Sequence, residues 1–289
     1  MLNKKILWMI GLLFLVGCSH GPVHQVKQKR FTGSWKKNFS KKNVGLSEVS
    51  QTQDSLYWGT EKGFVFRIDA ATMKKKWRKN LHDTISTAVF VSGNHAYVGT
   101  QKGFVYCLEA ETGRTLWKQN YQTSIRGIFA MFQEHLFIMG LDGQVIGVKA
   151  LSGEIGFQRR FFVTDSFTLA YELVSAISDS FLLVTLPSSE VIAINKELET
   201  SWQKNFQGLL GSDLIQGYVS IDSLDKERFL ITPYMQSPFV IDAKGEVTNT
   251  LEKVATSAPP VIESNKVYFV EQARVVTINL ETFLMDKEY

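Results

Sequence analysis

The amino-acid sequence predicts an all-β protein built from four-stranded sheets, and three features of the chain lead to this prediction. Residues 77–81 read Trp-Arg-Lys-Asn-Leu and residues 117–121 read Trp-Lys-Gln-Asn-Tyr, so one phrase recurs after 40 positions. Upstream of each phrase, residues 57–69 and 97–109 share two apolar runs around Gly-Thr-x-Lys-Gly. After the amino terminus, no stretch of roughly 10–15 residues has the apolar spacing of a helix. A period of about 40 residues with strand-like composition is typical of stacked supersecondary units.

Each copy of the repeat contains four strand-like segments in a fixed order. An apolar run comes first, as in residues 86–91 and 257–262. Two further runs around a polar turn are typical of a hairpin. A second turn follows, as in residues 109–113, and the phrase with Trp supplies a fourth strand. Four strands per copy form one blade of a β-propeller.

The second turn is expected to differ between copies. Gly113 and Gly153 suit a position with positive φ, because glycine has no Cβ atom to clash there. Met73 and Phe283 stand at the same position in two other copies. We therefore expect no uniform turn.

The number of copies sets the number of blades. The hairpin recurs at residues 57–69, 97–109, 137–149, 183–195, 230–242 and 268–279. We expect about six blades, within a range of five to eight. Residues 35–39 read Trp-Lys-Lys-Asn-Phe with no hairpin before them, whereas the last copy reaches Tyr289 with little or no fourth strand. The amino-terminal strand is therefore predicted to complete the last blade and leave no long open edge.

The first residues predict export and a lipid anchor. Lys4 and Lys5 precede an apolar run over residues 6–16, which fits a signal peptide and is shorter than the roughly 20 residues that span a bilayer. The residues before Cys18 resemble the bacterial lipobox, which implies that residues 1–17 are removed and Cys18 is lipidated. Ser19 resembles the residue at this position in lipoproteins sorted to the outer membrane. The alternative is an ordinary signal peptide that contains a cysteine.

The expected domain organisation follows from this anchor. We expect residues 18–30 to carry the lipid and a flexible tether, and residues 31–289 to form a single propeller domain. Residues 20–34 lack a strand pattern, with Gly21 and Pro22 near their start. The protein would then be anchored to a membrane and not span it. The stretch 161–180 exceeds the repeat spacing, so a longer loop is expected there.

The charge of the chain does not indicate a nucleic-acid partner. Removing residues 1–17 takes away two lysines and no acid, so the net charge falls from +4 to +2. Before the first acid, Glu48, the predicted mature chain carries Lys27, Lys29, Arg30, Lys36, Lys37, Lys41 and Lys42. This arm either lies on anionic headgroups or is a solvated tether.

Cysteine and histidine use does not predict a redox or metal site. With Cys18 lipidated, Cys107 has no intrachain partner, and we interpret it as a buried, inert thiol, with an intermolecular disulfide as the alternative. The histidines show no paired ligand spacing, and His95 and His135 occupy equivalent places in successive copies. No nucleophile stands with a base and an orienting group. We therefore assign no catalytic residue, metal or cofactor.

The repeated phrases resemble the PQQ-type β-propeller repeat over roughly residues 31–289. The resemblance implies that the aromatic residue of each closing phrase docks one blade on the next; these residues are Trp35, Trp77, Trp117, Phe157 and Trp202. Quinoprotein dehydrogenases carry this repeat, but they are far longer and many use a vicinal disulfide. BamB lipoproteins of the outer-membrane β-barrel assembly machinery carry it behind a lipobox and tether, with eight blades and no enzymatic activity. The organisation of this chain is similar to theirs.

A short segment resembles the loop through which BamB proteins dock on their partner. That loop reads Leu-x-Leu-Arg-Gly before an inner strand, and residues 123–127 here read Thr-Ser-Ile-Arg-Gly at the corresponding place. The resemblance implies partner contacts by Ile125 and Arg126, with Thr123 and Gly127 as further candidates. The alternative is that Ile125 faces the core and Arg126 is solvated. The family's second, acidic contact loop finds no convincing counterpart in residues 164–174.

These observations lead to one functional hypothesis and two alternatives. We expect a non-catalytic, lipid-anchored scaffold on the periplasmic side of the outer membrane. One copy would bind the periplasmic domains of the barrel-forming assembly subunit. The first alternative is an envelope lipoprotein that binds another periplasmic protein or a glycan, with Tyr218, Tyr234 and Phe239 as glycan-stacking candidates. The second alternative, with less support, is a quinoprotein-type enzyme.

The predicted closure of the last blade can be tested by deletion. Removing residues 31–40 should lower the midpoint of thermal unfolding far more than removing residues 20–29, because only the first segment carries strand-like residues. Circular dichroism melting of the two deletion variants makes the comparison. Equal midpoints would rule out a structural role for residues 31–40.

Overall fold

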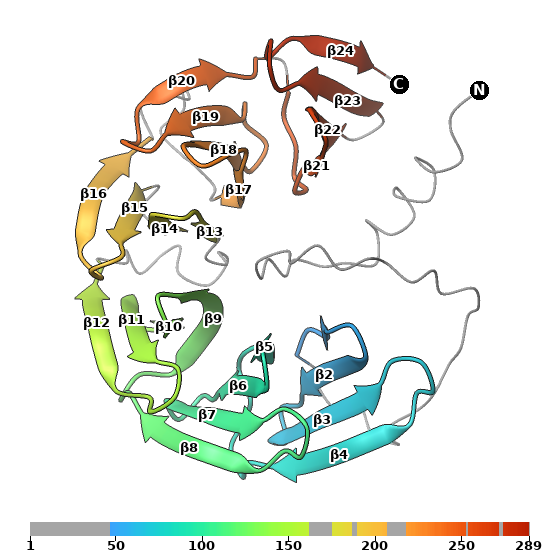
Figure 1. The fold of residues 1–289 in the computed structure, drawn as a ribbon, viewed down its shortest axis with the longest axis vertical. Coiled ribbons are helices and arrows are strands. Elements are labelled where there is room, and N and C mark those ends of the chain that lie inside the picture. The colour runs from blue at the N-terminus through green and yellow to red at the C-terminus, as the bar shows by residue number, and fades with distance from the viewer. Residues whose placement is uncertain are drawn as a thin grey trace. The chain divides into compact units, whose positions relative to one another are not determined.

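A computed structural model describes residues 47–161, 175–186, 190–206, 218–252, 254–271 and 274–288. Within these ranges the chain forms six four-stranded antiparallel sheets (Figure 1). This confirms the predicted all-β class and the six blades. None of the described residues belongs to a helix long and apolar enough to cross a membrane.

The strands follow the predicted order in every blade. The first blade contains β1 (Ser50–Gln51), β2 (Ser55–Gly59), β3 (Phe64–Asp69) and β4 (Lys75–Asn80). The second contains β5 (Phe90–Ser92), β6 (His95–Gly99), β7 (Phe104–Glu109) and β8 (Thr115–Asn120). The third contains β9 (Ile125–Phe132), β10 (His135–Gly140), β11 (Gln144–Lys149) and β12 (Ile155–Arg160).

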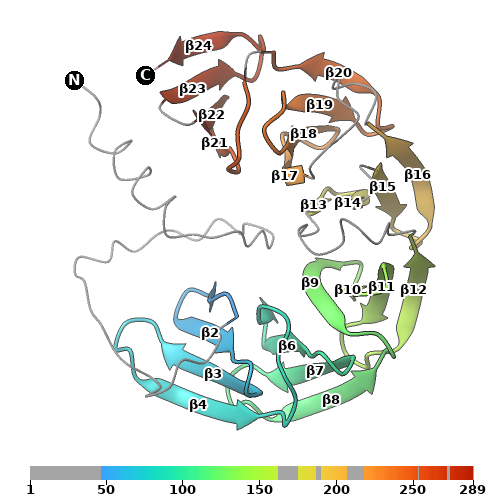
Figure 2. The same ribbon diagram turned by 180° about the vertical axis from the view of Figure 1, so that it is seen from behind.

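The carboxy-terminal blades repeat this plan. The fourth contains β13 (Ser175–Ile177), β14 (Phe181–Thr185), β15 (Glu190–Asn195) and β16 (Thr200–Asn205). The fifth contains β17 (Tyr218–Ser223), β18 (Arg228–Pro233), β19 (Phe239–Asp242) and β20 (Val247–Thr250). The sixth contains β21 (Val261–Glu263), β22 (Lys266–Glu271), β23 (Arg274–Asn279) and β24 (Met285–Glu288). Figure 2 shows the same strands from behind.

The chain divides into two compact units. The first comprises the described residues through Ile128 together with residues 138–141 and 150–153, and the second comprises the remaining described residues. In the first unit, Tyr57, Leu81, Val98 and Leu108 belong to a core shared by the first two blades. In the second unit, one core joins the fourth and fifth blades, and another joins the fifth and sixth.

A shift of register between the third and fourth strands recurs in every described blade. In the first two blades it lies after Arg67 and after Cys107. In these two blades the last residue before the shift pairs with the tryptophan of the fourth strand. Arg67 pairs with Trp77, and Cys107 pairs with Trp117. A β-bulge of this kind bends the strand and redirects its side chains.

The closing tryptophans dock on the following blade, as the resemblance implied. The indole N–H of Trp77 donates to the carbonyl oxygen of Ala110 at 2.9 Å, and that of Trp117 donates to Ala150 at 2.8 Å. In the second unit Trp202 donates in the same way to Ala243 at 2.9 Å. The same directional contact therefore joins the first, second and fourth blades each to the blade that follows.

Glycine in the receiving turn makes room for the indole. Gly113 has a φ of 72°, and an added Cβ atom would lie 2.9 Å from the Trp77 ring. At Gly153, with a φ of 74°, an added Cβ atom would lie 3.0 Å from Trp117. Both the backbone conformation and the packing therefore require glycine here.

The expectation that this turn would not be uniform is wrong for its backbone. Met73 and Phe283 adopt φ values of 56° and 53°, the same left-handed conformation as the glycines. The amide of Met73 donates to Asp69 and that of Phe283 donates to Asn279, as Gly113 donates to Glu109. The shared hydrogen bond holds the turn even where the residue is unfavourable at positive φ.

The first strands of the second and sixth blades are shorter than predicted. Strand β5 begins at Phe90 although the apolar run begins at residue 86. The Thr87 hydroxyl accepts a hydrogen bond from the Gly99 amide at 2.9 Å, so a side chain replaces part of the strand ladder. Strand β21 begins at Val261, after two prolines that have no amide to donate.

Cys107 is buried, as predicted. Its side chain is fully excluded from solvent, and burial raises the pKa of the thiol to about 12. The thiol is therefore protonated and unreactive at neutral pH.

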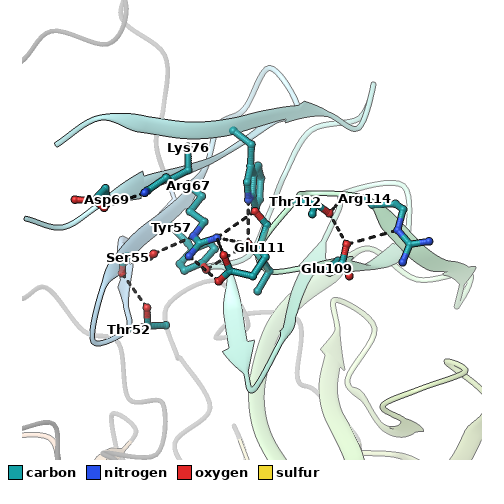
Figure 3. Close-up of polar contacts among 12 residues, drawn as sticks. Thr52, Ser55, Tyr57, Arg67, Asp69, Lys76, Glu109, Glu111, Thr112 and Arg114 are labelled. Atoms are coloured by element: carbon teal, nitrogen blue, oxygen red, sulfur yellow. Dashed lines mark hydrogen bonds and ion pairs between the residues drawn. The ribbon is translucent and has the colours of Figure 1, made fainter. Parts of the chain in front are cut away.

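Arg67 joins the first two blades through its guanidinium (Figure 3). Its Nε donates to the Ser55 hydroxyl at 2.9 Å, and its Nη1 donates to the carbonyl oxygens of Ala110 and Glu111 at 3.2 and 3.1 Å. Nη2 donates to the Glu111 carboxylate at 2.8 Å. The Arg67 residue is only 8% exposed, so these acceptors are the groups that offset its loss of water.

The predicted closure by residues 31–40 lies outside the described residues. The premise that the last copy has little or no fourth strand needs correction, because β24 pairs with β23 from Val276 to Ile278. Strand β24 has four residues, as does β20, whereas β4, β8, β12 and β16 have six.

The indole contact can be tested at Trp117. Trp117→Phe keeps an aromatic ring and removes the N–H donor to Ala150, so it should destabilise the fold by about 1 kcal/mol. Trp117→Ala also removes the packing and should cost roughly 3–5 kcal/mol. Chemical denaturation measures both values. Phe157 holds the corresponding position in the third blade, so the Phe variant is expected to fold. Equal stability of all three proteins would contradict the docking role.

Replacing Arg67 should destabilise the fold more than replacing its ion-pair partner Glu111. Arg67→Ala removes the donor to the buried Ser55 hydroxyl and to the Glu111 carbonyl, whereas the Ala110 carbonyl keeps the indole N–H of Trp77. The variant should cost roughly 2–3 kcal/mol of unfolding free energy. Glu111→Ala removes a carboxylate whose side chain is 67% exposed and should cost less than about 1 kcal/mol. The two unfolding curves give the comparison. A larger loss for Glu111→Ala would show that the ion pair matters more than the buried hydrogen bonds.

Candidate protein-interaction site

The connector between the second and third blades is held at both ends by backbone hydrogen bonds. At its start, the Tyr121 amide donates to the carbonyl of Gly103 at 2.9 Å. At its end, the Ile125 amide donates to the carbonyl of Thr100 at 3.1 Å. The Tyr121 hydroxyl donates to the Gly153 carbonyl at 2.6 Å. A connector fixed in this way has little freedom to lose when a partner binds.

Ile125 lies in the core, so it is not a direct contact for a partner in this structure. Its side chain is fully excluded from solvent. A Cβ atom added to Gly99 would lie 2.5 Å from Ile125 Cγ2, which shows how closely the side chain covers that glycine. The Ser86 hydroxyl also donates to the Ile125 carbonyl. Ile125 therefore faces the core and fixes the connector. This was the alternative to the predicted partner contact.

The other candidates differ in accessibility. Arg126 and Gly127 are half-buried at the start of β9, and Thr123 is 8% exposed. A Cβ atom added to Gly127 would meet no atom within 4 Å. Arg126 is thus the candidate that combines a charge with access to solvent.

Leu141 is an exposed apolar residue beside this connector that the sequence analysis missed. It lies in the turn between β10 and β11, and its side chain is 50% exposed. Its amide donates to the carbonyl of Ser124 at 2.8 Å, which ties this turn to the connector. Glu61 and Gln101 stand at the corresponding turn position of the first two copies. The change from a polar residue in the first two copies to Leu141 in the third is the sequence feature that could have indicated this exposed apolar side chain.

Antiparallel topology fixes which turns share an end of the blade. In the second blade the β6–β7 turn and the connector after β8 lie at one end, and the β7–β8 turn lies at the other. Arg114, in the β7–β8 turn, is exposed and pairs with Glu109 at 3.6 Å. It therefore offers an arginine remote from the connector as a control.

The described residues contain no group of three or more His, Cys, Asp or Glu side chains placed to hold a metal ion. His95 and His135 each begin the second strand of a blade, as their repeat equivalence predicts. His135 Nδ1 lies 2.6 Å from the carbonyl oxygen of Gln133. The two histidines therefore occupy the same position of the repeat, at the start of the second strand in the second and third blades.

The glycan-stacking candidates do not present a shared aromatic surface. Tyr218 is 8% exposed and Phe239 is 1% exposed, so both belong to the core. Only Tyr234, at 41%, presents its ring to solvent. The rings of Tyr218 and Phe239 are therefore structural. Cys18, the predicted longer loop within 161–180 and the segment 164–174 lie wholly or largely outside the described residues.

Comparison with known proteins identifies the family of the repeat. The family model described as "Outer membrane protein assembly factor BamB" matches residues 20–231. No curated protein matches the chain.

Two solved structures show the same fold at low sequence identity. BamB from Moraxella catarrhalis aligns with a TM-score of 0.68 and 16% identity, covering 84% of this chain and 75% of that one. The computationally designed Ika8 protein aligns with a TM-score of 0.67 and 12% identity, covering 84% of this chain and 74% of that one. Identities this low support the β-propeller fold alone.

Proposed function

The chain belongs to the family of the outer membrane protein assembly factor BamB, and from this membership we propose that it is a non-catalytic scaffold for outer-membrane protein assembly. It is anchored through a lipid on Cys18 to the periplasmic face of the outer membrane. Its partner is the barrel-forming subunit of the assembly complex. The family match supports the role, and the connector before β9 supports the place of contact.

Arg126 is the proposed electrostatic contact with the partner. The connector presents it from a segment held by Tyr121 and Ile125, so its backbone is already ordered before binding. An arginine can form several directed hydrogen bonds to a carboxylate, which favours specific docking. An acidic or carbonyl-rich surface of the subunit is therefore the expected counterpart.

Leu141 is the proposed apolar contact beside Arg126. Its exposed side chain supplies what the buried Ile125 does not, while its amide keeps the turn against the connector. Protein interfaces commonly place an apolar residue and an arginine together at their centre. Ile125 and Thr123 would then position this surface, and Gly127 would leave space for the partner.

The proposal can be tested by charge reversal at Arg126. Arg126→Glu should weaken the complex by about 2 kcal/mol or more, because a partner carboxylate would then face a like charge. Copurification of the subunit from detergent-solubilised envelopes, followed by titration with its purified periplasmic domains, measures the loss. Leu141→Asp should weaken binding in the same direction.

The matched control is Arg114→Glu, which reverses an exposed arginine at the other end of the blade. It should leave the affinity unchanged, and all three variants should retain the wild-type unfolding midpoint. Full binding by a folded Arg126→Glu protein would remove the connector from the proposal. Absence of the subunit from wild-type preparations would remove the partner and leave another periplasmic protein or a glycan as the ligand to identify.

A further inference from the structure

The outer strand of the first blade is strongly basic. Five of the six residues 74–79 are lysine or arginine, and Trp77 is the exception. Lys74, Lys75, Lys76 and Arg78 are exposed, and Lys79 is half-buried. Strand β4 stands last in its sheet, so one of its edges has no neighbouring strand within that sheet.

The described acids neutralise little of this charge. Lys76 Nζ lies 3.1 Å from Asp69 Oδ2, and the Arg78 guanidinium lies 4.7 Å from the centre of the Phe64 ring. Among the described residues, Lys74, Lys75 and Lys79 form no ion pair within 4.0 Å. A row of cationic side chains therefore remains available to an anionic ligand.

The fold itself does not require so many charges at this place. Strand β8 has the same register in the second blade, and the equivalent residues 114–119 contain two basic residues, Arg114 and Lys118. Thr115 stands where the first blade has Lys75, and Gln119 stands where it has Lys79. One charge on an exposed edge strand already discourages edge-to-edge pairing. The excess on β4 therefore calls for a function other than edge protection.

We propose that β4 binds the anionic headgroups of the membrane to which the chain is anchored. Successive side chains of a strand point to opposite faces, so Lys79 shares the face of Trp77, and Arg78 lies on the other face. Alternate side chains are about 6.6 Å apart, so the basic groups of either face can meet neighbouring headgroups. Strand β4 presents no exposed large apolar side chain, which a protein interface would be expected to contain. Anionic phospholipid therefore fits this strand better than an acidic protein does.

This inference rests on the proposed lipid anchor at Cys18. A chain from residue 18 to residue 47 reaches at most about 100 Å when fully extended, so a lipid on Cys18 keeps the first blade within that distance of the membrane. Near an anionic surface each lysine strengthens binding roughly fivefold, and the effect is screened by salt. The tether limits the distance between the first blade and the membrane, and the binding of β4 to headgroups would orient the blade on the membrane surface.

The test uses the full mature lipoprotein reconstituted on two kinds of vesicle. One kind contains phosphatidylcholine alone, and the other also contains phosphatidylglycerol. Flotation with the neutral vesicles reports on the anchor independently of β4. Acetylation of lysines, followed by peptide mass spectrometry, then reports on β4. Lys226, which is exposed and lies 3.3 Å from Asp179, serves as a reference amine.

Acetylation of Lys74, Lys75 and Lys79 should be about fivefold slower on the anionic vesicles, and high salt should restore it. Lys226 should react equally on both vesicles. The variant Lys75→Thr/Lys79→Gln copies β8, so it should fold normally, and the difference at Lys74 should shrink in it. Equal rates on both vesicles would overturn the proposal. So would protection that appears only in native membranes with other proteins present, because an acidic protein would then be the ligand.

Failure of the anchor gives a different result from failure of β4. A protein that does not float with neutral vesicles lacks a working lipid anchor, whatever β4 does on anionic ones. A protein that floats with both vesicles and shows no lysine protection keeps its anchor and loses the β4 proposal.

Discussion

The hydrogen bond from a closing-strand indole to a carbonyl of the next blade is the contact on which the rest of the structure depends. It recurs at Trp77, Trp117 and Trp202 with donor–acceptor distances of 2.8–2.9 Å. The register shift at the end of each third strand and the glycine of each receiving turn make it possible. Because a hydrogen bond is directional, this contact sets the position of one blade against the next more narrowly than apolar packing alone would. Between the first two blades, Arg67 adds further bonds to the same turn.

This constraint accounts for the connector that carries Arg126. The Trp117 indole and the Tyr121 hydroxyl both donate to the turn that holds Ala150 and Gly153, so the strand before the connector is fixed at two points. The connector is further bonded to the hairpin turn of the second blade. Ile125 is buried as a result, and Arg126 follows it at the surface. A scaffold that binds through such a segment loses little conformational entropy on docking, because the ordering has already occurred during folding.

The sequence alone predicts those parts of the molecule that the repeat specifies locally. The phrase with Trp and the glycines of the turns recur because the first, second and fourth blades make the same contact, so the blades and their order can be read from the period. The turn at Met73 could not be predicted from its residue, because a backbone hydrogen bond to Asp69 holds the left-handed conformation there. The burial of Ile125 depends on how closely Gly99 of another strand approaches it, which no local pattern encodes. The exposure of Leu141 could be inferred only by comparing the same turn position across copies.

The proposed docking surface is the connector before β9, which is already ordered in the free protein. Hydrogen–deuterium exchange of the full lipoprotein, with and without the periplasmic domains of the barrel-forming subunit, tests this most directly. Docking at the connector should slow exchange in residues 122–127 and 140–143 when the subunit is bound, and it should leave the turn at residues 111–114 unchanged. In the free protein the Ile125 amide should already exchange slowly, because the Thr100 carbonyl accepts its hydrogen bond. Fast exchange through the connector in the free protein, or protection confined to other blades, would contradict this proposal.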